Sequence, residues 1–295
     1  MSNVALRLVR PEAGPVQTEP PVEAMFRFLG TDTRVVSASV RVLQDWIARY
    51  GAFRILPGPA EITVRVHRAD DVAPAPGQVT IEWGGHRRTW QGADPVLPPL
   101  ATPPLDRWTY LHGAAVGRAG HAVLLLGGPR AGKTLLALTA VARGANLLGD
   151  GLLPLDEGDM LLAPFLEAIR LRRSELDQLT IDPAHPSLVP LRTPAGVVEW
   201  RAEPFGLLGQ RAGRVAAGVA AVVFLRSAGF VSEPRLEPLA PAQALHRLQQ
   251  SLHWPAPDPQ RTQAALIRVC RQVPSFTVSV GAPYQTARLL DGLLT

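Results

Sequence analysis

One loop constrains this chain more than any other feature: Gly127-Gly128-Pro129-Arg130-Ala131-Gly132-Lys133-Thr134, which satisfies the pattern G-x-x-x-x-G-K-[ST] in full. The apolar run 122–126 comes directly before it and is typical of a strand that is covered on both faces. The run 135–143 comes directly after it, contains good helix formers and ends at Gly144. This order of strand, glycine loop and helix predicts a site for a nucleoside triphosphate, which we expect to be ATP with magnesium.

Each conspicuous residue of the loop has a chemical task in such a site. Gly127 and Gly132 permit backbone angles and close approaches that a Cβ atom would prevent, so that successive N–H groups can surround the β-phosphate. The positive end of the following helix adds to this attraction, and Thr134 supplies a hydroxyl group for Mg²⁺. Lys133 would neutralise charge between the β- and γ-phosphates, and Arg130 would contact phosphate. We therefore expect residues 127–134 to bind ATP and Lys133 also to act in catalysis.

The composition singles out the same lysine. Lys133 is the single lysine among the 30 Lys and Arg residues of the chain. A GC-rich genome explains the many arginines, but it does not explain why the exception lies in this loop. An ammonium group is a compact charge that can follow phosphate oxygens into a tight loop, whereas a guanidinium group is larger and planar. The composition therefore indicates a functional lysine.

Length and charge exclude several other classes of protein. The 295 residues are 46% hydrophobic and 19% charged, as in compact globular proteins. The net charge is +5, but the arginines are scattered, so we expect no nucleic-acid partner. Cys270 is the single cysteine, which excludes an internal disulfide and fits a reducing cytoplasm. No signal peptide is evident, and the longest apolar run, 215–225, is too short to span a bilayer. We expect a cytoplasmic protein that does not bind membranes.

The pattern of the chain divides it into two domains, 1–100 and 105–295. The first shows β-type alternation between turn residues and one short helical segment, which predicts a small β-rich α+β domain. Five prolines between residues 92 and 104 mark the linker. The first domain is expected to have strands at 25–29, 34–40, 62–66 and 79–83 and a helix at 42–50.

The second domain alternates apolar runs with helical segments and is predicted to be α/β with a mixed sheet. Its expected strands are 108–116, 122–126, 146–148, 152–155, 197–201, 215–225 and 276–280. Its expected helices are 135–143, 173–179, 241–252, 261–271 and 285–294.

The acid that steadies magnesium is not in its usual place. In common phosphate-loop ATPases and GTPases a later apolar strand ends in an acid, but here the run 220–225 is followed by Arg226 and Ser227. A guanine-reading Asn-Lys-x-Asp motif would need a second lysine, and no Leu-Ser-Gly-Gly transporter signature occurs. Both of those classes are therefore disfavoured.

Asp150 is the alternative acid, sixteen residues beyond Thr134. A strand that returned beside the loop's own strand would carry Asp150 to the edge of the sheet where the phosphates bind. His112 lies on the segment leading into the loop's strand and could contact Asp150. Two simpler interpretations stay open at this stage: Asp150 could be a turn residue in Gly149-Asp150-Gly151, and His112 a buried structural histidine.

At these residues the sequence resembles the catalytic domain of the bacterial HPr kinase/phosphorylase family and its kinase-like relatives. The family pattern is a His-Gly pair, the glycine loop, a helix ending in Arg-Gly, and a Leu-Val-x-Asp-Asp turn. In this chain it is matched by His112-Gly113, residues 127–134, Arg143-Gly144 and Leu147-Leu148-Gly149-Asp150. A further family segment, Glu-x-Arg before a glycine turn, is similar to Glu199-Trp200-Arg201.

The resemblance implies a kinase that transfers the γ-phosphoryl group of ATP to a serine hydroxyl of a protein or peptide. Asp150 would then accept the proton of the attacking hydroxyl, His112 would tune it, and Thr134, Asp150 and Glu199 would place magnesium. Relatives in clusters for peptide natural products, including lasso peptides, phosphorylate a precursor peptide, and we expect a substrate of that kind. The resemblance does not fix the oligomeric state, and a homo-oligomer stays open.

The sequence departs from the family in two places. Gly151 stands where the family has its second Asp, which bears on metal binding and on the reverse, phosphate-removing reaction. Ala202-Glu203-Pro204 replaces the family's glycine signature, which bears on HPr as the substrate. Two alternatives therefore accompany the kinase hypothesis: a kinase of a small hydroxylated metabolite, and a regulatory ATP-binding module without transfer activity. Glu199 also fits an ordinary solvated strand face.

Overall fold

The structure is a computed structural model, and it describes residues 21–37, 39–68, 78–91, 107–192, 196, 198–226, 233–253 and 258–295. The chain separates into two compact units, Met1–Leu105 and Asp106–Thr295. The expected linker at 92–104 lies outside the described residues. In the described parts, no helix is both long and apolar enough to cross a membrane.

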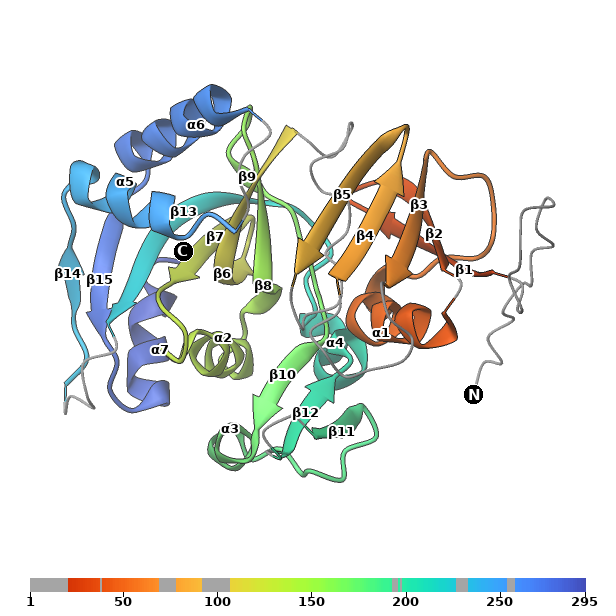
Figure 1. The fold of residues 1–295 in the computed structure, drawn as a ribbon. Coiled ribbons are helices and arrows are strands. Elements are labelled where there is room, and N and C mark those ends of the chain that lie inside the picture. Colours follow the sequence, from red (N-terminus) through yellow and green to blue (C-terminus); the bar gives the residue numbers. More distant parts are fainter. Residues whose placement is uncertain are drawn as a thin grey trace. The chain divides into compact units, whose positions relative to one another are not determined.

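The first unit is a five-stranded sheet in the order β1-β2-β3-β4-β5 with one helix (Figure 1). Its elements are β1 (Val22–Phe28), β2 (Thr31–Ser37), α1 (Val40–Tyr50), β3 (Ile62–Arg68), β4 (Gln78–Trp83) and β5 (His86–Gln91). The strands β2 and β3 are parallel, and α1 is the crossover between them. Ser39 caps α1 by accepting a hydrogen bond from the N–H group of Val42.

Aromatic side chains form the core of this unit. Phe26 and Phe28 from β1 meet Trp46 and Tyr50 from α1, and all four are fully buried. The spacing of Trp46 and Tyr50 places them on one side of the helix, one turn apart. Burying these large rings supplies the hydrophobic stabilisation that a small unit needs.

The second unit is built on a mixed seven-stranded sheet in the order β14-β15-β13-β7-β6-β8-β9. Its strands are β6 (Trp108–Arg118), β7 (His121–Leu126), β8 (Asn146–Asp156), β9 (Leu161–Leu162), β13 (Ala217–Arg226), β14 (Leu236–Pro238) and β15 (Ser275–Ser279). The central strands β7, β13 and β15 are parallel to one another. The strand β6 is antiparallel to β7 and β8, so β8 runs in the same direction as β7.

Helices cover both faces of this sheet (Figure 1). One face packs against α2 (Lys133–Ala142) and α7 (Pro283–Asp291), and the other against α5 (Pro241–Gln250) and α6 (Pro259–Gln272). Because both faces are covered, consecutive residues of the middle strands are apolar, as residues 122–126 of β7 and 221–225 of β13 show.

A second, three-stranded sheet lies on the α2 side of the unit. Its order is β10-β12-β11, with β10 (Ile169–Arg172), β11 (Leu188–Arg192) and β12 (Val198–Ala202), all antiparallel. The short helices α3 (Arg173–Leu179) and α4 (Pro204–Leu208) flank it. Ile169 and Leu171 point into the same core as α2, so Arg170 and Arg172 point the other way.

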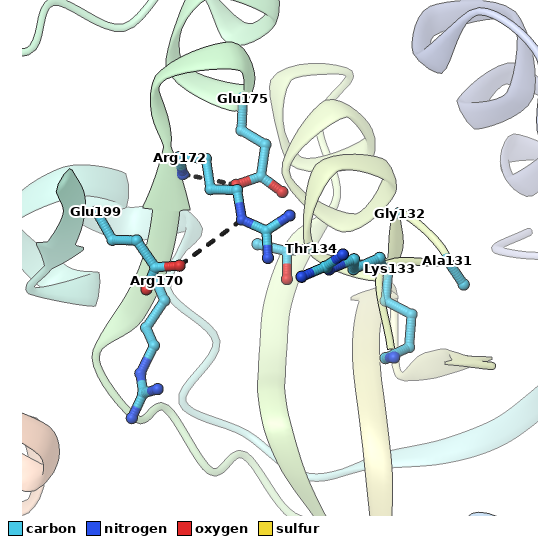
Figure 2. A pocket seen from close by; sticks show the side chains of 9 residues that line it. Ala131, Gly132, Lys133, Thr134, Arg170, Arg172, Glu175 and Glu199 are labelled. Carbon is cyan, nitrogen blue, oxygen red and sulfur yellow. Dashed lines mark hydrogen bonds and ion pairs between the residues drawn. The ribbon is translucent and has the colours of Figure 1, made fainter. Parts of the chain in front are cut away.

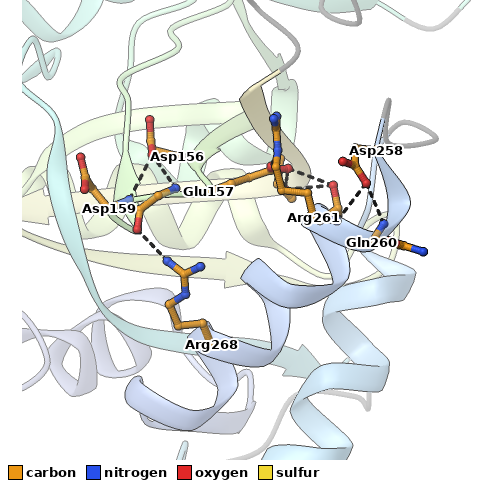
Figure 3. Close-up of polar contacts among 10 residues, drawn as sticks. Asp156, Glu157, Asp159, Asp258, Gln260, Arg261 and Arg268 are labelled. Atoms are coloured by element: carbon orange, nitrogen blue, oxygen red, sulfur yellow. Dashed lines mark hydrogen bonds and ion pairs between the residues drawn. The ribbon is translucent and has the colours of Figure 1, made fainter.

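A buried glutamate joins α6 to the sheet (Figure 3). Glu157 accepts hydrogen bonds from the hydroxyl groups of Thr109 at 2.7 Å and Thr262 at 2.9 Å, and it pairs with Arg261. Asp258 caps the start of α6 through two backbone N–H groups at 3.0 Å. These contacts are structural, and they account for a charged residue that is only 6% exposed.

Most of the predicted elements are confirmed to within a few residues, and one prediction is wrong. The segments 146–148 and 152–155 were expected as two strands, but they form the single strand β8. The Gly149-Asp150-Gly151 string is therefore not a turn. Gly151 has φ +112°, and the register shifts near Leu148, so the strand bends at this point without ending. Short elements were missed: β5, β9, β10, β11, β14 and α4.

Candidate functional site

The loop 127–134 joins β7 to α2, and its backbone has the angles that its glycines allow. Gly127 has φ +151°, and a Cβ atom there would lie 2.9 Å from the carbonyl oxygen of Leu225 in the neighbouring strand β13. Gly132 has φ +88° and is the N-cap of α2. Arg130 also has a positive φ, +63°, which is uncommon outside glycine. The loop thus turns sharply at the end of a buried strand and leads into a helix N-terminus.

Lys133 is folded back over the loop. Its Nζ atom donates hydrogen bonds to the carbonyl oxygens of Gly127 and Gly128, both at 2.9 Å. Burial lowers the pKa of this ammonium group, and the charge of Asp150 opposes that effect. The lysine is therefore already held at the loop, where it can exchange carbonyl partners for phosphate oxygens.

Asp150 and Thr134 contact each other directly. The Thr134 hydroxyl lies 3.0 Å and 2.9 Å from the two oxygens of the Asp150 carboxylate. Thr134 is in the first turn of α2 and Asp150 is in the middle of β8, so the contact joins the loop's helix to the sheet. A hydroxyl and a carboxylate at the end of such a loop are the oxygen ligands that magnesium prefers.

The route by which Asp150 reaches the loop differs from the predicted one. We expected its strand to lie beside the loop's strand β7, but β6 lies between them. The reason is the two-residue turn Ala119-Gly120, where both residues have positive φ, which closes β6 and β7 into a hairpin. Ala114 of β6 pairs with Asp150 on one side and with Leu125 on the other, so Asp150 is still level with the end of β7.

A second carboxylate, Glu167, lies next to Asp150 and was not predicted. The segment after β9 runs parallel to β8 at Gly149 and Phe165, which places Glu167 level with Gly151. A Cβ atom at Gly151 would be 3.6 Å from Oε2 of Glu167. Glu167 is 5% exposed. Its carboxylate thus occupies the space beside Gly151, the position where the resembled family has its second acid.

The environment shifts the ionisation of Asp150. Removal from water raises the pKa of its carboxyl group to about 6, and the negative charges of Glu167 and Glu175 act in the same direction. The hydrogen bond from Thr134 and the charge of Lys133 oppose this rise. A carboxyl group with such a pKa is near the optimum for accepting a proton at neutral pH.

The loop forms one side of a cavity of about 250 Å³, and the three-stranded sheet forms the other (Figure 2). We call the first side the loop wall, which comprises Arg130, Ala131, Gly132, Lys133 and Thr134, and the second the arginine wall, which comprises Arg170, Arg172, Glu175 and Glu199. Four cationic and two anionic side chains therefore surround this space. Such an excess of cations suits a phosphate-rich ligand.

The arginine wall is held together by two contacts of Arg172. Its Nε atom lies 3.7 Å from Oε1 of Glu199, its neighbour across β10 and β12. Its backbone N–H donates to Oε2 of Glu175 at 2.7 Å, which fixes the start of α3. Glu199 thus faces an arginine, whereas we predicted it as a magnesium ligand; that role stays a prediction without a contact to support it.

His112 is on the same face of the sheet as Asp150, since it lies two residues before Ala114 on β6. Its ring stacks on that of His253 with a centroid distance of 5.6 Å. The segment around Leu252 pairs with β6 where β7 has already ended, which brings the two rings together. The residue is exposed, so the simpler interpretation of a buried histidine is wrong. Its proposed influence on Asp150 stays a prediction.

Metal binding is consistent with the donors present. In the described parts of the chain, no group of three or more His, Cys, Asp and Glu side chains is arranged around a common point. Magnesium does not need one, because it is usually held by one or two carboxylates, water and substrate phosphates. Thr134, Asp150 and Glu167 supply that smaller set of oxygens.

Comparisons with known proteins find similarity to solved structures alone. No family model matches the chain, and no curated protein matches it. Among the solved structures that match is the HPr(Ser) kinase/phosphatase from Coxiella burnetii, with 14% sequence identity. The match covers 62% of this chain and 87% of that chain, with a TM-score of 0.33.

Proposed function

We propose that this protein is an ATP-dependent phosphotransferase and that the loop 127–134 binds the phosphates of its nucleotide. The observation that carries the proposal is the contact of Thr134 with Asp150 at 2.9 Å, because it places a carboxylate at the start of the loop's helix. A strand, a glycine loop with Lys133 and a helix N-terminus supply the phosphate site. Asp150 takes the place of the acid that is missing at the end of β13, where Arg226 stands.

The residues present fit a magnesium ion. Thr134 and the carboxylate pair of Asp150 and Glu167 would hold it, and Glu167 would supply the second acid that Gly151 does not. When bound, magnesium neutralises charge on the β- and γ-phosphates.

The reaction we infer is transfer of the γ-phosphoryl group to a hydroxyl group. The acceptor oxygen forms a bond to the γ-phosphorus while the bond from that phosphorus to the bridging oxygen of ADP breaks. Asp150 accepts the proton that the hydroxyl loses, as the carboxylate that lies beside Thr134 at the start of the loop's helix. Lys133 stabilises the charge that collects on the departing ADP.

The acceptor is inferred to be a serine in a peptide or protein, including a precursor peptide of the lasso type. The cavity supports the position of the acceptor but not its identity. It lies against the loop that is proposed to hold the nucleotide phosphates, so an acceptor hydroxyl group that enters it would meet the γ-phosphate there. The serine acceptor itself rests on the resemblance of the sequence to the kinase family.

The test is ATP turnover with magnesium in the presence of a pool of Ser-containing peptides, for the wild type, Lys133→Ala and Asp150→Asn. We expect peptide-dependent release of ADP and a phosphorylated peptide, with both lost in Asp150→Asn while nucleotide still binds. Turnover that needs no acceptor and is unchanged in Asp150→Asn would contradict the proposal. A parallel set of sugars and nucleosides separates a peptide kinase from a metabolite kinase.

A further inference from the structure

Arg172 is the residue of the arginine wall that extends toward Thr134 in the loop wall (Figure 2). Figure 2 shows its side chain extending toward Thr134, whereas Arg170 from the same strand turns away. Both residues line the cavity together with Lys133. Arg172 therefore faces the loop from the opposite wall, and its side chain is 47% exposed, so that a ligand can reach it.

Two acids fix the position of Arg172 without neutralising its whole guanidinium group. Glu199 approaches the Nε atom at 3.7 Å, on the stem side of the group. Glu175 binds the backbone N–H at 2.7 Å and leaves the side chain free to project. A guanidinium group has five N–H donors in a planar fork, so the terminal donors remain directed into the cavity for a bidentate contact with phosphate oxygens.

Phosphoryl transfer is favoured by a second cation that faces the γ-phosphoryl group from the side opposite Lys133. Charge spreads over the three outer oxygens of the γ-phosphoryl group in the transition state, and Lys133 approaches from the loop side alone. A cation on the opposite wall can neutralise the remaining oxygens. We propose that Arg172, positioned by Glu199, binds the γ-phosphoryl group and stabilises its transfer. This inference rests on the proposed function.

The roles of the two residues differ. Arg172 is a catalytic residue in this account: it contacts the transferred group while the bond to ADP breaks and the bond to the acceptor oxygen forms, and it gains or loses no proton. Glu199 is a positioning residue that acts through Arg172. This role accounts for the position of Glu199 beside an arginine, while the magnesium role expected from the sequence stays a prediction.

The first test compares the binding of two nucleotides by calorimetry with magnesium present. The wild type is expected to bind AMP-PNP, which has a γ-phosphate, more tightly than ADP. Arg172→Ala should weaken AMP-PNP roughly 10- to 100-fold and ADP less than about 2-fold, as loss of a charge-assisted bidentate contact predicts. Arg173→Ala is the matched control, because this neighbour is exposed and pairs with Asp177, and both affinities should stay unchanged.

The outcomes separate this inference from the proposed function. If the wild type prefers AMP-PNP and Arg172→Ala keeps that preference in full, the inference is wrong and the proposed function stands. If the wild type binds neither nucleotide, both are wrong. Circular dichroism of each variant shows that it is folded, and Arg172→Lys keeps the charge without the fork, so an intermediate affinity is expected.

The second test addresses Glu199 through kinetics. Arg172→Ala should lower kcat roughly 100- to 1,000-fold with a smaller change in KM for ATP, because the contact strengthens in the transition state. Glu199→Gln should lower kcat by about 10-fold, and the double variant should be no slower than Arg172→Ala alone. Additive losses in the double variant would mean that Glu199 acts independently of Arg172 and would overturn its positioning role.

Discussion

The two walls of the cavity are built in different ways. The loop wall rises from the middle of the seven-stranded sheet, where β7 is buried and Gly127 packs against the backbone of β13. The arginine wall belongs to a short sheet whose polar residues, Arg172 and Glu199, are 47% and 23% exposed. The first wall is anchored in the core of that sheet and is proposed to hold one chemical group, the phosphate chain. The second carries the charges that would complete the reaction.

The largest expected effect is the loss of kcat when the acid beside the loop wall, Asp150, is replaced. Asp150 contacts Thr134 of the loop wall, and Asp150→Asn keeps the shape of the side chain but removes the group that accepts the proton. We expect kcat for phosphoryl transfer to fall by roughly 1,000-fold or more, with the Kd for ADP measured without magnesium changed less than about 3-fold. Steady-state kinetics and calorimetry measure the two values. If kcat fell by less than about 10-fold, Asp150 would not be the group that accepts the proton. The arginine wall would then be the main source of catalysis.

Replacing Gly127 and its neighbour Gly128 tests how closely the start of the loop packs against the sheet. Gly127→Ala should destabilise the protein by about 2–3 kcal/mol, because φ is +151° and the new Cβ would lie 2.9 Å from the Leu225 carbonyl oxygen. Gly128→Ala is the matched control, since its Cβ would meet nothing within 4 Å. Chemical denaturation measures both. Equal stability of the two variants would show that the loop can shift to accommodate a Cβ atom beside the Leu225 carbonyl oxygen.

The raised pKa of Asp150, the residue that contacts Thr134 of the loop wall, predicts a pH dependence of stability. The folded-state pKa of Asp150 is raised to about 6, above its ordinary value, so the wild type loses stability as pH rises from about 4 to 6 and has lost it fully at pH 8. Asp150→Asn lacks this charge. It should be about 2 kcal/mol more stable than the wild type at pH 8 and less so at pH 5. Thermal unfolding at the two pH values measures this; a pH-independent difference would contradict the shift.

The smallest expected effect compares two acids, Glu167, which is buried beside Asp150, and Glu199, which lines the arginine wall. Glu167→Gln should weaken Mn²⁺ binding in the presence of ADP by about 10-fold, because it removes a carboxylate beside Asp150. Glu199→Gln should leave that affinity within about 2-fold, because Glu199 faces Arg172. Titration of Mn²⁺ followed by electron paramagnetic resonance gives both values. The reverse order would support the magnesium role predicted for Glu199 and contradict the one proposed for Glu167.

The same contrast explains what the sequence could and could not reveal. The loop wall is local: glycines, Lys133 and Thr134 are consecutive, and their flanking runs predict β7 and α2. Asp150 was found because it follows the helix closely, although the position of β6 between the two strands was not foreseen. The sequence also did not show that β8 continues through Gly149 and Gly151. Glycine ordinarily indicates a turn, but here it permits a bend within the strand.

The arginine wall depends on contacts that no local pattern shows. The four residues of β10 are too short a run to predict a strand, and the pairing of Arg172 with Glu199 joins segments far apart in the sequence. Glu167 gave one weak signal, a lone acid within the apolar run 165–169, which fits a buried functional carboxylate. The strand β5 was missed because its sequence is polar, although the Gly84-Gly85 pair before it is a hairpin signal.

The most direct test of the account is the electron paramagnetic and nuclear double resonance spectrum of Mn²⁺ bound with ADP, for the wild type and for Thr134→Val. Thr134, Asp150 and Glu167 would hold the metal beside the phosphates of the nucleotide. We expect phosphorus coupling to Mn²⁺ in the wild type, and weaker binding of Mn²⁺ in the presence of ADP in Thr134→Val. Mn²⁺ that binds without phosphorus coupling, or with an affinity that is unchanged without the Thr134 hydroxyl, would contradict a metal and nucleotide site at this loop.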